Sequence, residues 1–384
     1  MPVDGDPESH GLLRHKTFRT LDMETCNSCC TRSVCKPGTR GVVAGSLGIS
    51  TLLLIGVLML GMDHGRSQYP VKFLVVGDWG RMGQYNQSHV AAMMGLKASL
   101  LGPGFIISVG DNFYPSGLTS PSDKHFSQSF TSAYNALSLQ VPWYAILGNH
   151  DYGDKCYDEE PGCYPTGDLF YSPNHQMHSD LATRDWRWNC NRTFQMQLAG
   201  GQVDFFFIDT SPFVQKYYSK PWANFTGGLM EQDWQHQLKE FEQKLMASRA
   251  MWKIVFGHHP PRSNGHHNNT VELMQHVEPL LQAAGVQAYF AGHDHNLEHI
   301  HVPGRTPHYI ISGGGSKTER PFIGKAGSRF QWPSSGFVSV ELADQEMAVE
   351  FLGYGTGADD NAPMYVARVP REAPRLRRKE LRRD

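Results

Sequence analysis

The sequence predicts an α/β fold in which a two-sheet β-sandwich is flanked by helices. Its 384 residues are 40% hydrophobic and 11% aromatic, a composition that supports a globular core and excludes global disorder. From Tyr69 onward, short apolar runs alternate with stretches of helical pattern, which is typical of helices packed outside sheets. The last apolar runs follow one another without a helical stretch between them, which favours an antiparallel portion.

The expected elements begin just after residue 69, and no internal repeat is visible. The strands are expected at residues 71–76, 104–109, 143–147, 203–208, 252–256, 288–291, 308–311, 337–342 and 347–352. The helices are expected at residues 89–101, 124–137, 228–248 and 270–285.

Residues 41–62 form an apolar stretch of 22 residues without a charge, long enough to cross a bilayer as a helix. Arg32, Lys36 and Arg40 precede it, and the positive-inside rule then places the N-terminus in the cytosol. We therefore expect a single-pass type II membrane protein whose larger domain is lumenal or extracellular. A cleaved signal peptide is the competing interpretation, but forty residues precede the apolar stretch.

This interpretation divides the chain into five parts. They are a cytosolic tail (1–40), a transmembrane signal anchor (41–62), a linker (63–68), a globular domain (69–370) and a basic C-terminal tail (371–384).

Cysteines and glycosylation acceptors agree with that orientation. Four cysteines close to the anchor on its cytosolic side are candidates for S-acylation, with a small zinc site as the alternative. Three cysteines beyond the anchor permit one disulfide, most simply between Cys156 and Cys163, and Cys190 then stays unpaired. The cytosolic cysteines are Cys26, Cys29, Cys30 and Cys35, and the acceptor asparagines, all beyond the anchor, are Asn86, Asn191, Asn224 and Asn268.

Five of the expected strands end in glycine followed by side chains that can bind metal. Because ligands gather beyond the carboxyl ends of strands in α/β sheets, we expect these side chains to converge. Each motif alone is more often a turn or a capped loop, and only their joint occurrence argues for a metal site. The residues are Asp78, Asp111, Tyr114, Asn149, His150, Asp151, His258, His259, His293 and His295.

The mixture of side chains suits two different metal ions. Imidazole suits zinc and iron, carboxylate suits harder ions, and phenolate suits a highly charged centre such as ferric iron. Asp111 is the natural bridging ligand, because a carboxylate has two oxygens and Tyr114 is three residues away. His293 and His295 are one residue apart and can each face a different ion. Two ions about 3.5–4 Å apart would hold both the attacking and the leaving oxygen of a phosphoryl transfer.

The motifs GD-x-G, GD-x-x-Y, GNHD, V-x-x-H and GH-x-H occur in this order, and the series resembles the purple acid phosphatases among the calcineurin-like metallophosphoesterases. The spacing is similar to that of their small branch, the tartrate-resistant acid phosphatases. The resemblance implies a metallophosphatase domain at 69–370, an acid phosphatase that hydrolyses phosphate monoesters, and a centre of Fe(III) with a second divalent metal (Fe, Zn or Mn). It assigns Asp78, Tyr114 and His295 to the ferric ion, Asn149, His258 and His293 to the divalent ion, and Asp111 to both.

The resemblance also implies two catalytic histidines. His150 matches the residue that holds the phosphate and the leaving group. The second matches His267 by its spacing from His258, with its neighbour His266 as the alternative. His259 stands where the family often has an aromatic residue, which leaves its role open. Asp151 is expected to orient neighbouring groups instead of binding metal.

The mechanism expected from these residues is direct attack of a metal-bound hydroxide, without a covalent enzyme intermediate. A cation lowers the pKa of its bound water far below that of bulk water. A protonated His150 or His267 would stabilise the departing alkoxide. Because an imidazolium needs low pH, we expect an acidic optimum.

Three other functions stay open at this point. One is a phosphodiesterase or nucleotidase of the same superfamily, against which Tyr114 argues; the others are a catalytically silent membrane scaffold and a membrane adaptor that acts through the cytosolic cysteines. The 35 basic and 37 acidic residues nearly cancel, so no nucleic-acid partner is expected. The expected partners are small phosphate esters or a phosphoprotein, and the membrane; the sequence indicates no oligomeric state.

Overall fold

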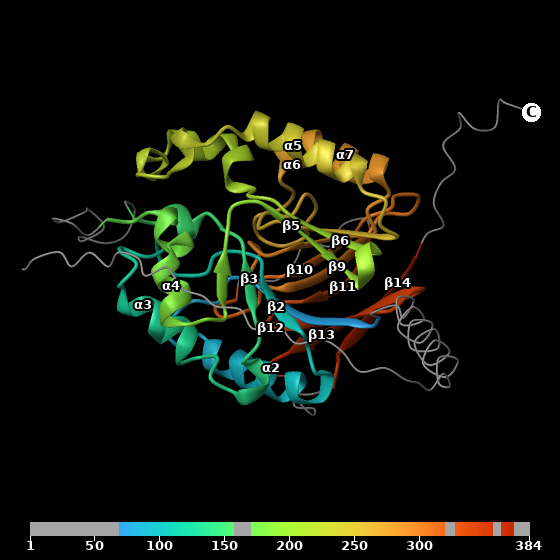
Figure 1. Ribbon diagram of the computed structural model, residues 1–384, viewed down its shortest axis with the longest axis horizontal. Coiled ribbons are helices and arrows are strands. Elements are labelled where there is room, and N and C mark those ends of the chain that lie inside the picture. Colours follow the sequence, from blue (N-terminus) through green and yellow to red (C-terminus); the bar gives the residue numbers. More distant parts are fainter. Residues whose placement is uncertain (1–68, 157–169, 319–326, 356–361, 372–384) are drawn as a thin grey trace, which may run out of the picture. The chain divides into compact units, whose positions relative to one another are not determined.

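Two seven-stranded sheets form the centre of the protein in the computed structural model (Figure 1). The structure describes residues 69–156, 170–318, 327–355 and 362–371. Every described residue belongs to one compact unit, which lies within residues 65–384.

The first sheet has the strand order β14-β13-β12-β1-β2-β3-β4. Strands β1 to β4 run parallel, whereas β12 pairs antiparallel with β1, and β13 and β14 continue the antiparallel portion. The bounds are β1 Val71–Val76, β2 Phe105–Ser108, β3 Trp143–Ala145, β4 Trp188–Cys190, β12 Gly336–Leu342, β13 Glu346–Gly353 and β14 Tyr365–Pro370.

The second sheet has the strand order β11-β9-β10-β8-β7-β6-β5. Strands β6, β7, β8 and β10 are parallel, and β5, β9 and β11 pair antiparallel with their neighbours. The bounds are β5 Phe194–Leu198, β6 Val203–Phe207, β7 Trp252–Phe256, β8 Ala288–Ala291, β9 Leu297–His301, β10 His308–Ser312 and β11 Ser328–Trp332.

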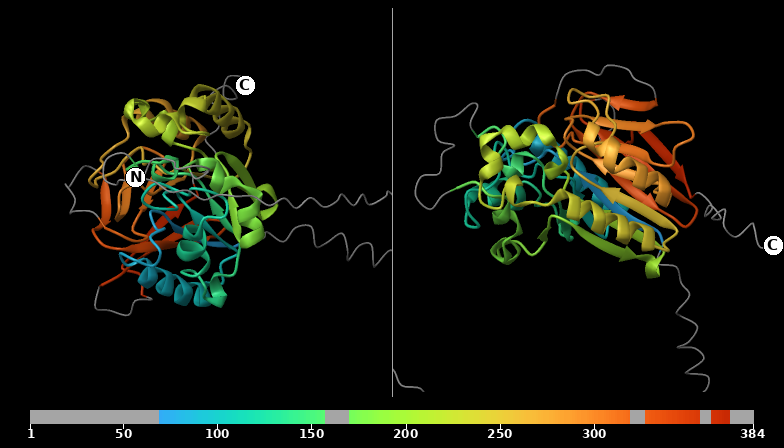
Figure 2. Two further views of the ribbon diagram at one scale, coloured as in Figure 1. Left: turned by 90° about the vertical axis from the view of Figure 1, so that its left-hand side faces the viewer. Right: turned by 90° about the horizontal axis from the view of Figure 1, so that it is seen from above.

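Helices lie on the outer faces of both sheets (Figures 1 and 2). The α-helices are α2 Gln87–Leu101, α3 Lys124–Phe126, α4 Ser179–Arg184, α5 Trp234–Ala247, α6 Val271–His276 and α7 Glu278–Ala284. A π-helical turn, η1, spans Ser127–Thr131. The short 3₁₀ helices are η2 Leu137–Leu139, η3 His150–Tyr152, η4 Pro173–Met177, η5 Ala199–Gly201, η6 Ser211–Phe213, η7 Gln215–Ser219, η8 Pro221–Asn224 and η9 Leu229–Glu231.

Strand β1 illustrates how the layers pack. Phe73 points into the space between the sheets, where its ring centroid lies 5.2 Å from that of Phe205 on β6 and 6.3 Å from that of Phe290 on β8. The next residue, Leu74, joins the buried cluster on the helical side, which includes Val90 of α2. Successive strand residues face opposite sides, and both sides of β1 are covered. This double burial explains why the strand is apolar throughout.

All nine expected strands occur, each within two residues of its expected ends. The apolar runs do not predict β4, β5, β9, β11 and β14. These strands are short or carry polar residues, as in LEHIH of β9. The expected helix at 270–285 is divided into α6 and α7, since Pro279 in the first turn of α7 has no N–H for the helical hydrogen bond. The stretch 124–137 forms only α3, the π-helical turn and the beginning of η2.

The expectation of a single-pass membrane protein requires correction. Among the described residues, no helix is both long enough and apolar enough to cross a bilayer. The stretch 41–62, expected as the anchor, lies outside the described residues, as do the four cysteines before it. No membrane or compartment is therefore assigned to the protein. The pairing of Cys156 with Cys163 stays a prediction, because Cys163 also lies outside the described part of the chain.

A stack of histidines connects the two sheets on the side of β9 and β14. His299 on β9 hydrogen-bonds through Nδ1 to the Tyr365 hydroxyl on β14 (3.0 Å) and through Nε2 to His308 Nδ1 on β10 (2.9 Å). His301 stacks on His308 with ring centroids 4.0 Å apart. Burial, together with the neighbouring histidines and Arg329, lowers the pKa of His299 and of His308 to about 3 each. The rings of His299 and His308 are therefore neutral in the folded protein above about pH 3.

This stack predicts a loss of stability in acid. An unfolded histidine binds a proton below pH 6.5, whereas the folded His299 does so only near pH 3, so the free energy of unfolding falls as pH drops from 6.5. His299→Phe should reduce the loss between pH 6.5 and 4 by about 1–3 kcal/mol, since one pKa unit corresponds to about 1.4 kcal/mol. Urea unfolding at several pH values measures this. His236→Phe, at an exposed position of α5, should keep the wild-type pH dependence, and a His299→Phe curve parallel to the wild type would contradict the prediction.

Candidate metal centre

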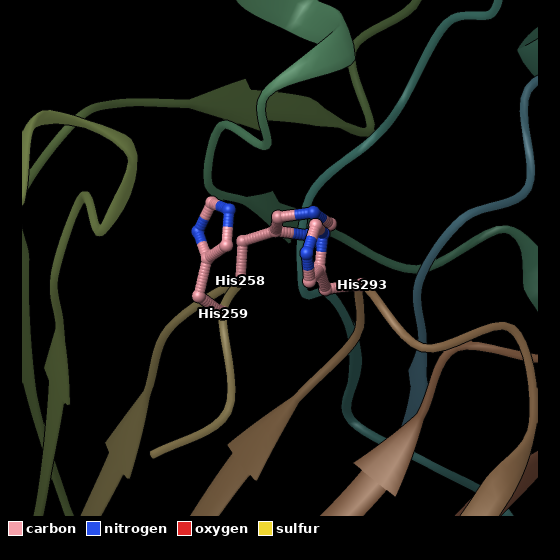
Figure 3. Close-up of side chains that lie close together, drawn as sticks. All are labelled: His258, His259 and His293. Atoms are coloured by element: carbon pink, nitrogen blue, oxygen red, sulfur yellow. The ribbon is translucent and has the colours of Figure 1, made fainter. Parts of the chain in front are cut away.

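The predicted metal ligands lie together where strands of both sheets end. Asp78 follows β1, Asp111 follows β2 and Asn149 follows β3, all in the first sheet, while His258 follows β7 and His293 follows β8 in the second. Main-chain hydrogen bonds join the two groups of strand ends, as from Gly77 N to Ser312 O (2.8 Å). Figure 3 shows His258 and His259 at the end of one strand, with His293 at the end of the neighbouring strand.

Three other predicted ligands surround the Tyr114 hydroxyl. It lies 3.0 Å from Asp78 Oδ1, 3.0 Å from Asp111 Oδ2 and 2.9 Å from His295 Nε2. His295 Nε2 is in turn 3.4 Å from Asp78 Oδ1. All four side chains are buried. Two carboxylates, a phenol and an imidazole so close together form a donor set for a hard, highly charged cation.

A second group of donors surrounds His258 Nε2. This nitrogen lies 3.2 Å from Asn149 Oδ1 and 3.3 Å from Asp111 Oδ2. The His293 ring lies beside it, with centroids 5.2 Å apart. Asp111 Oδ2 therefore belongs to both groups, which is the position that a bridging carboxylate requires.

Unusual backbone geometry accompanies the ligands. Asp78, Asp111 and His293 have positive φ angles of 61°, 51° and 69°. Residues other than glycine rarely adopt this left-handed region, and those that do cluster at functional sites. Gly148 supplies the space that the bridging carboxylate needs, since a Cβ at this position would lie 2.1 Å from Asp111 Oδ1.

The electrostatics of the cluster favour a bound cation. Burial raises the pKa of Asp111, but His258 and His150 outweigh it and hold this pKa below its usual value. Burial lowers the pKa of His258, yet the attraction of Asp111 brings it to about 9. The pKa of Tyr114 lies well above its usual value because of burial and of the carboxylates of Asp111 and Asp78. A bound cation would lower the pKa of Tyr114 and favour its phenolate form.

Neighbouring groups orient the ligands. The His258 ring contacts Val109 O through Nδ1 at 2.9 Å, which leaves Nε2 for a metal. The Asn149 amide donates to Asp154 Oδ2 at 2.8 Å, so its oxygen faces His258. Asp151 accepts hydrogen bonds from Gly148 N (2.8 Å) and, at 2.7 Å, from the Gln176 amide, as expected of an orienting group.

The candidate catalytic histidines line a cavity of about 680 Å³ beside these donors. His150 Nδ1 lies 2.5 Å from Pro115 O, and its Nε2 lies 4.0 Å from Asp111 Oδ2. The His267 ring centroid lies 4.2 Å from that of His293, and His266 stands next to it. The main-chain N–H of His267 donates to Asp294 Oδ1 at 2.7 Å.

Several residues of the site carry no recognisable pattern in the sequence. Asp154 orients Asn149, and the Arg81 guanidinium lies 3.5 Å from the centroid of the Tyr114 ring. Five basic side chains line the cavity: Arg81, Lys155, Lys216, Lys220 and Lys317. The strand-end motifs do not include them, and a single sequence offers no other signal for them.

Comparison with known proteins gives close relatives. Residues 71–297 match the calcineurin-like phosphoesterase family. Purple acid phosphatase 3 of Arabidopsis thaliana is 44% identical over 298 residues, which cover 76% of this chain and 76% of that protein. Human tartrate-resistant acid phosphatase type 5 is 27% identical over 84% of this chain and 98% of its own length.

Solved structures show the same fold. GAP50, the anchor in the inner membrane complex of Plasmodium, superposes with a TM-score of 0.60 at 21% identity, over 80% of this chain and 90% of that one. The fold and the family match define a metallophosphoesterase of the calcineurin-like class. The chain belongs to the purple acid phosphatases within that class, and it is an acid phosphatase. The resemblance stated from the motifs is thereby confirmed.

The orientation of Asn149 by Asp154 predicts a selective metal defect. Asp154→Ala should weaken the binding of one metal per chain about 10- to 100-fold, as is usual when a partner of a metal ligand is lost, and spare the other metal. Dialysis against graded chelator, followed by metal analysis, measures this. Asp180→Ala, whose side chain is 66% exposed, serves as the control. Equal losses of both metals, or none, would contradict the prediction.

Proposed function

We propose that this protein hydrolyses phosphate monoesters at acid pH with a pair of metal ions held at the strand ends. The proposal rests on the position of Asp111 Oδ2, which lies 3.0 Å from the Tyr114 hydroxyl and 3.3 Å from His258 Nε2. One oxygen shared by two donor groups suits a bridge between two ions, the arrangement used for phosphoryl transfer.

The donors fit the metals that the family resemblance implies. Asp78, Tyr114 and His295 would hold the ferric ion, because phenolate and carboxylate oxygens are hard donors. Asn149, His258 and His293 would hold the divalent ion, which is Fe, Zn or Mn. When bound, the two ions supply positive charge for the substrate phosphate and a water of lowered pKa that serves as the nucleophile.

The lining of the cavity supports an anionic substrate. Its five basic side chains outnumber its two carboxylates, and those two, Asp111 and Asp154, are already bound to groups of the site. A positive cavity attracts phosphate esters and speeds their binding. Small phosphate esters or a phosphoprotein are the substrate classes that this charge supports.

His150 is placed to assist the leaving group. If its Nδ1–H donates to Pro115 O, then Nε2 faces the cavity and the Asp111 carboxylate. When this nitrogen carries a proton, it can donate that proton to the departing alkoxide. His267 lies across the site beside His293 and is proposed as a second group in contact with the substrate. The need for an imidazolium supports an acidic optimum.

The donor group that contains Tyr114 predicts a coloured protein. The purified protein should show a visible charge-transfer band of phenolate bound to ferric iron, and Tyr114→Phe should abolish the band and lower the iron content. Visible absorption with metal analysis measures both. Tyr85→Phe, at an exposed tyrosine nearby, should keep the band. A colourless wild-type protein that contains iron would contradict the assignment of Tyr114.

His150 predicts a loss that depends on the leaving group. His150→Asn should lower kcat by about 10²- to 10⁴-fold for an alkyl phosphate, the range typical of general acid catalysis, with both metals retained. The loss should be smaller for p-nitrophenyl phosphate, whose leaving group needs no proton. Steady-state kinetics on both substrates measure this, with His178→Asn as the exposed control. Equal losses on the two substrates would exclude proton donation by His150.

A further inference from the structure

The ring of His259 lies next to the candidate metal ligands, yet both of its nitrogens contact other groups. His258, His259 and His293 could together hold a metal ion, since one nitrogen of each lies within 4.8 Å of the others. However, His259 Nδ1 lies 2.9 Å from the Thr210 hydroxyl, and Nε2 lies 2.9 Å from the Tyr217 hydroxyl. The side chains of His259, Thr210 and Tyr217 are buried. A ring with both nitrogens hydrogen-bonded has no lone pair left for a metal.

The donor and the acceptor of each hydrogen bond in this chain can be assigned. The main-chain N–H of His259 donates to Thr210 Oγ1 at 2.9 Å. Within the described residues, the Thr210 hydroxyl has one other partner, which is Nδ1 of the His259 ring. Because a buried hydroxyl proton without an acceptor is costly, the Thr210 hydroxyl donates its proton to Nδ1. Nδ1 is then the acceptor of a neutral ring, and Nε2–H donates to the Tyr217 oxygen. The Tyr217 hydroxyl proton is thereby left for a further acceptor.

A ligand bound in the cavity can supply an acceptor for that proton. Tyr217, on η7, lines the cavity together with His267, His293 and Asp111, the groups beside which the substrate phosphate would bind. A phosphoryl group carries charged oxygens that accept hydrogen bonds. A neutral donor fixed in advance of binding stabilises the charge of the transition state without reorganisation.

We infer that the Tyr217 hydroxyl donates a hydrogen bond to a phosphoryl oxygen of the substrate, and that His259 is a positioning residue that directs this hydroxyl and does not bind metal. The inference rests on the proposed phosphate-ester hydrolysis at the same cavity. It gives Tyr217 a catalytic role and gives His259 a role that is exerted through Tyr217 alone.

The test uses the full-length protein and four variants. Tyr217→Phe should lower kcat/KM for p-nitrophenyl phosphate about 10- to 100-fold, the usual effect of removing one hydrogen bond to a charged group. His259→Phe should cause a similar loss, and the double variant should lose no more than Tyr217→Phe alone, because the two residues act as one unit. His259→Gln, whose amide can still donate to Tyr217, should regain part of the activity. Every variant should keep the metal content of the wild type.

Tyr218→Phe is the matched control. Its hydroxyl donates to Pro212 O at 2.9 Å, and it belongs to the same short helix, η7, but does not line the cavity. This variant should match the wild type in activity. The binding of inorganic phosphate, followed by calorimetry, should weaken about tenfold in Tyr217→Phe and stay unchanged in Tyr218→Phe.

Three results would overturn the inference. They are wild-type kinetics in Tyr217→Phe, losses that multiply in the double variant, and the loss of a metal in His259→Phe. An inactive, metal-loaded wild-type protein would instead refute the proposed function. In that case the phosphate-binding measurement still tests the role of Tyr217, because it needs no turnover.

Discussion

The buried Asp111 carboxylate lies between the two groups of candidate metal ligands, and its position governs the geometry of the site. A buried carboxylate is costly unless positive charge or hydrogen bonds offset it. Here the offset comes from the His258 and His150 rings, from the His150 N–H at 2.9 Å and, in the proposed enzyme, from two metal ions. Asp111 has a left-handed backbone conformation, and the missing side chain at Gly148 leaves room for its carboxylate. A substitution at either position would displace the bridge.

The fold supplies this site by bringing two sheets to the same edge. The loops that follow strands of the first sheet carry the carboxylates, Tyr114 and Asn149, and the loops that follow strands of the second carry His258, His293 and His295. The apolar layer between the sheets, with Phe73 in its middle, therefore fixes the separation of the two halves of the donor set. Packing density in such a layer resists small shifts, which a metal centre with narrow distance limits requires.

The sequence allowed the strands of this layer and the seven candidate metal ligands to be located, because both leave strong local patterns: apolar runs, and glycine followed by a side chain that can bind metal. It did not reveal strands such as β9, which contributes His299 and His301 to the histidine stack, nor the break at Pro279. The sequence also contained no sign of Asp154, which lies in a turn, or of Tyr217, which lies in a short helix, because neither segment has a characteristic pattern. His259 was noticed but could not be interpreted, since its role depends on Thr210 and Tyr217, which are distant in the sequence. The resemblance to a known family supplied the assignment of ligands to individual ions.

Anomalous diffraction from crystals of the metal-loaded protein, recorded on both sides of the iron absorption edge, locates and identifies the bound metals. Two metal peaks are expected about 3.5–4 Å apart. The peak next to Tyr114 should be iron, Asp111 should contact both metals, and His259 should contact neither. A single peak, or a metal held by His258, His259 and His293 together, would refute the two-metal site.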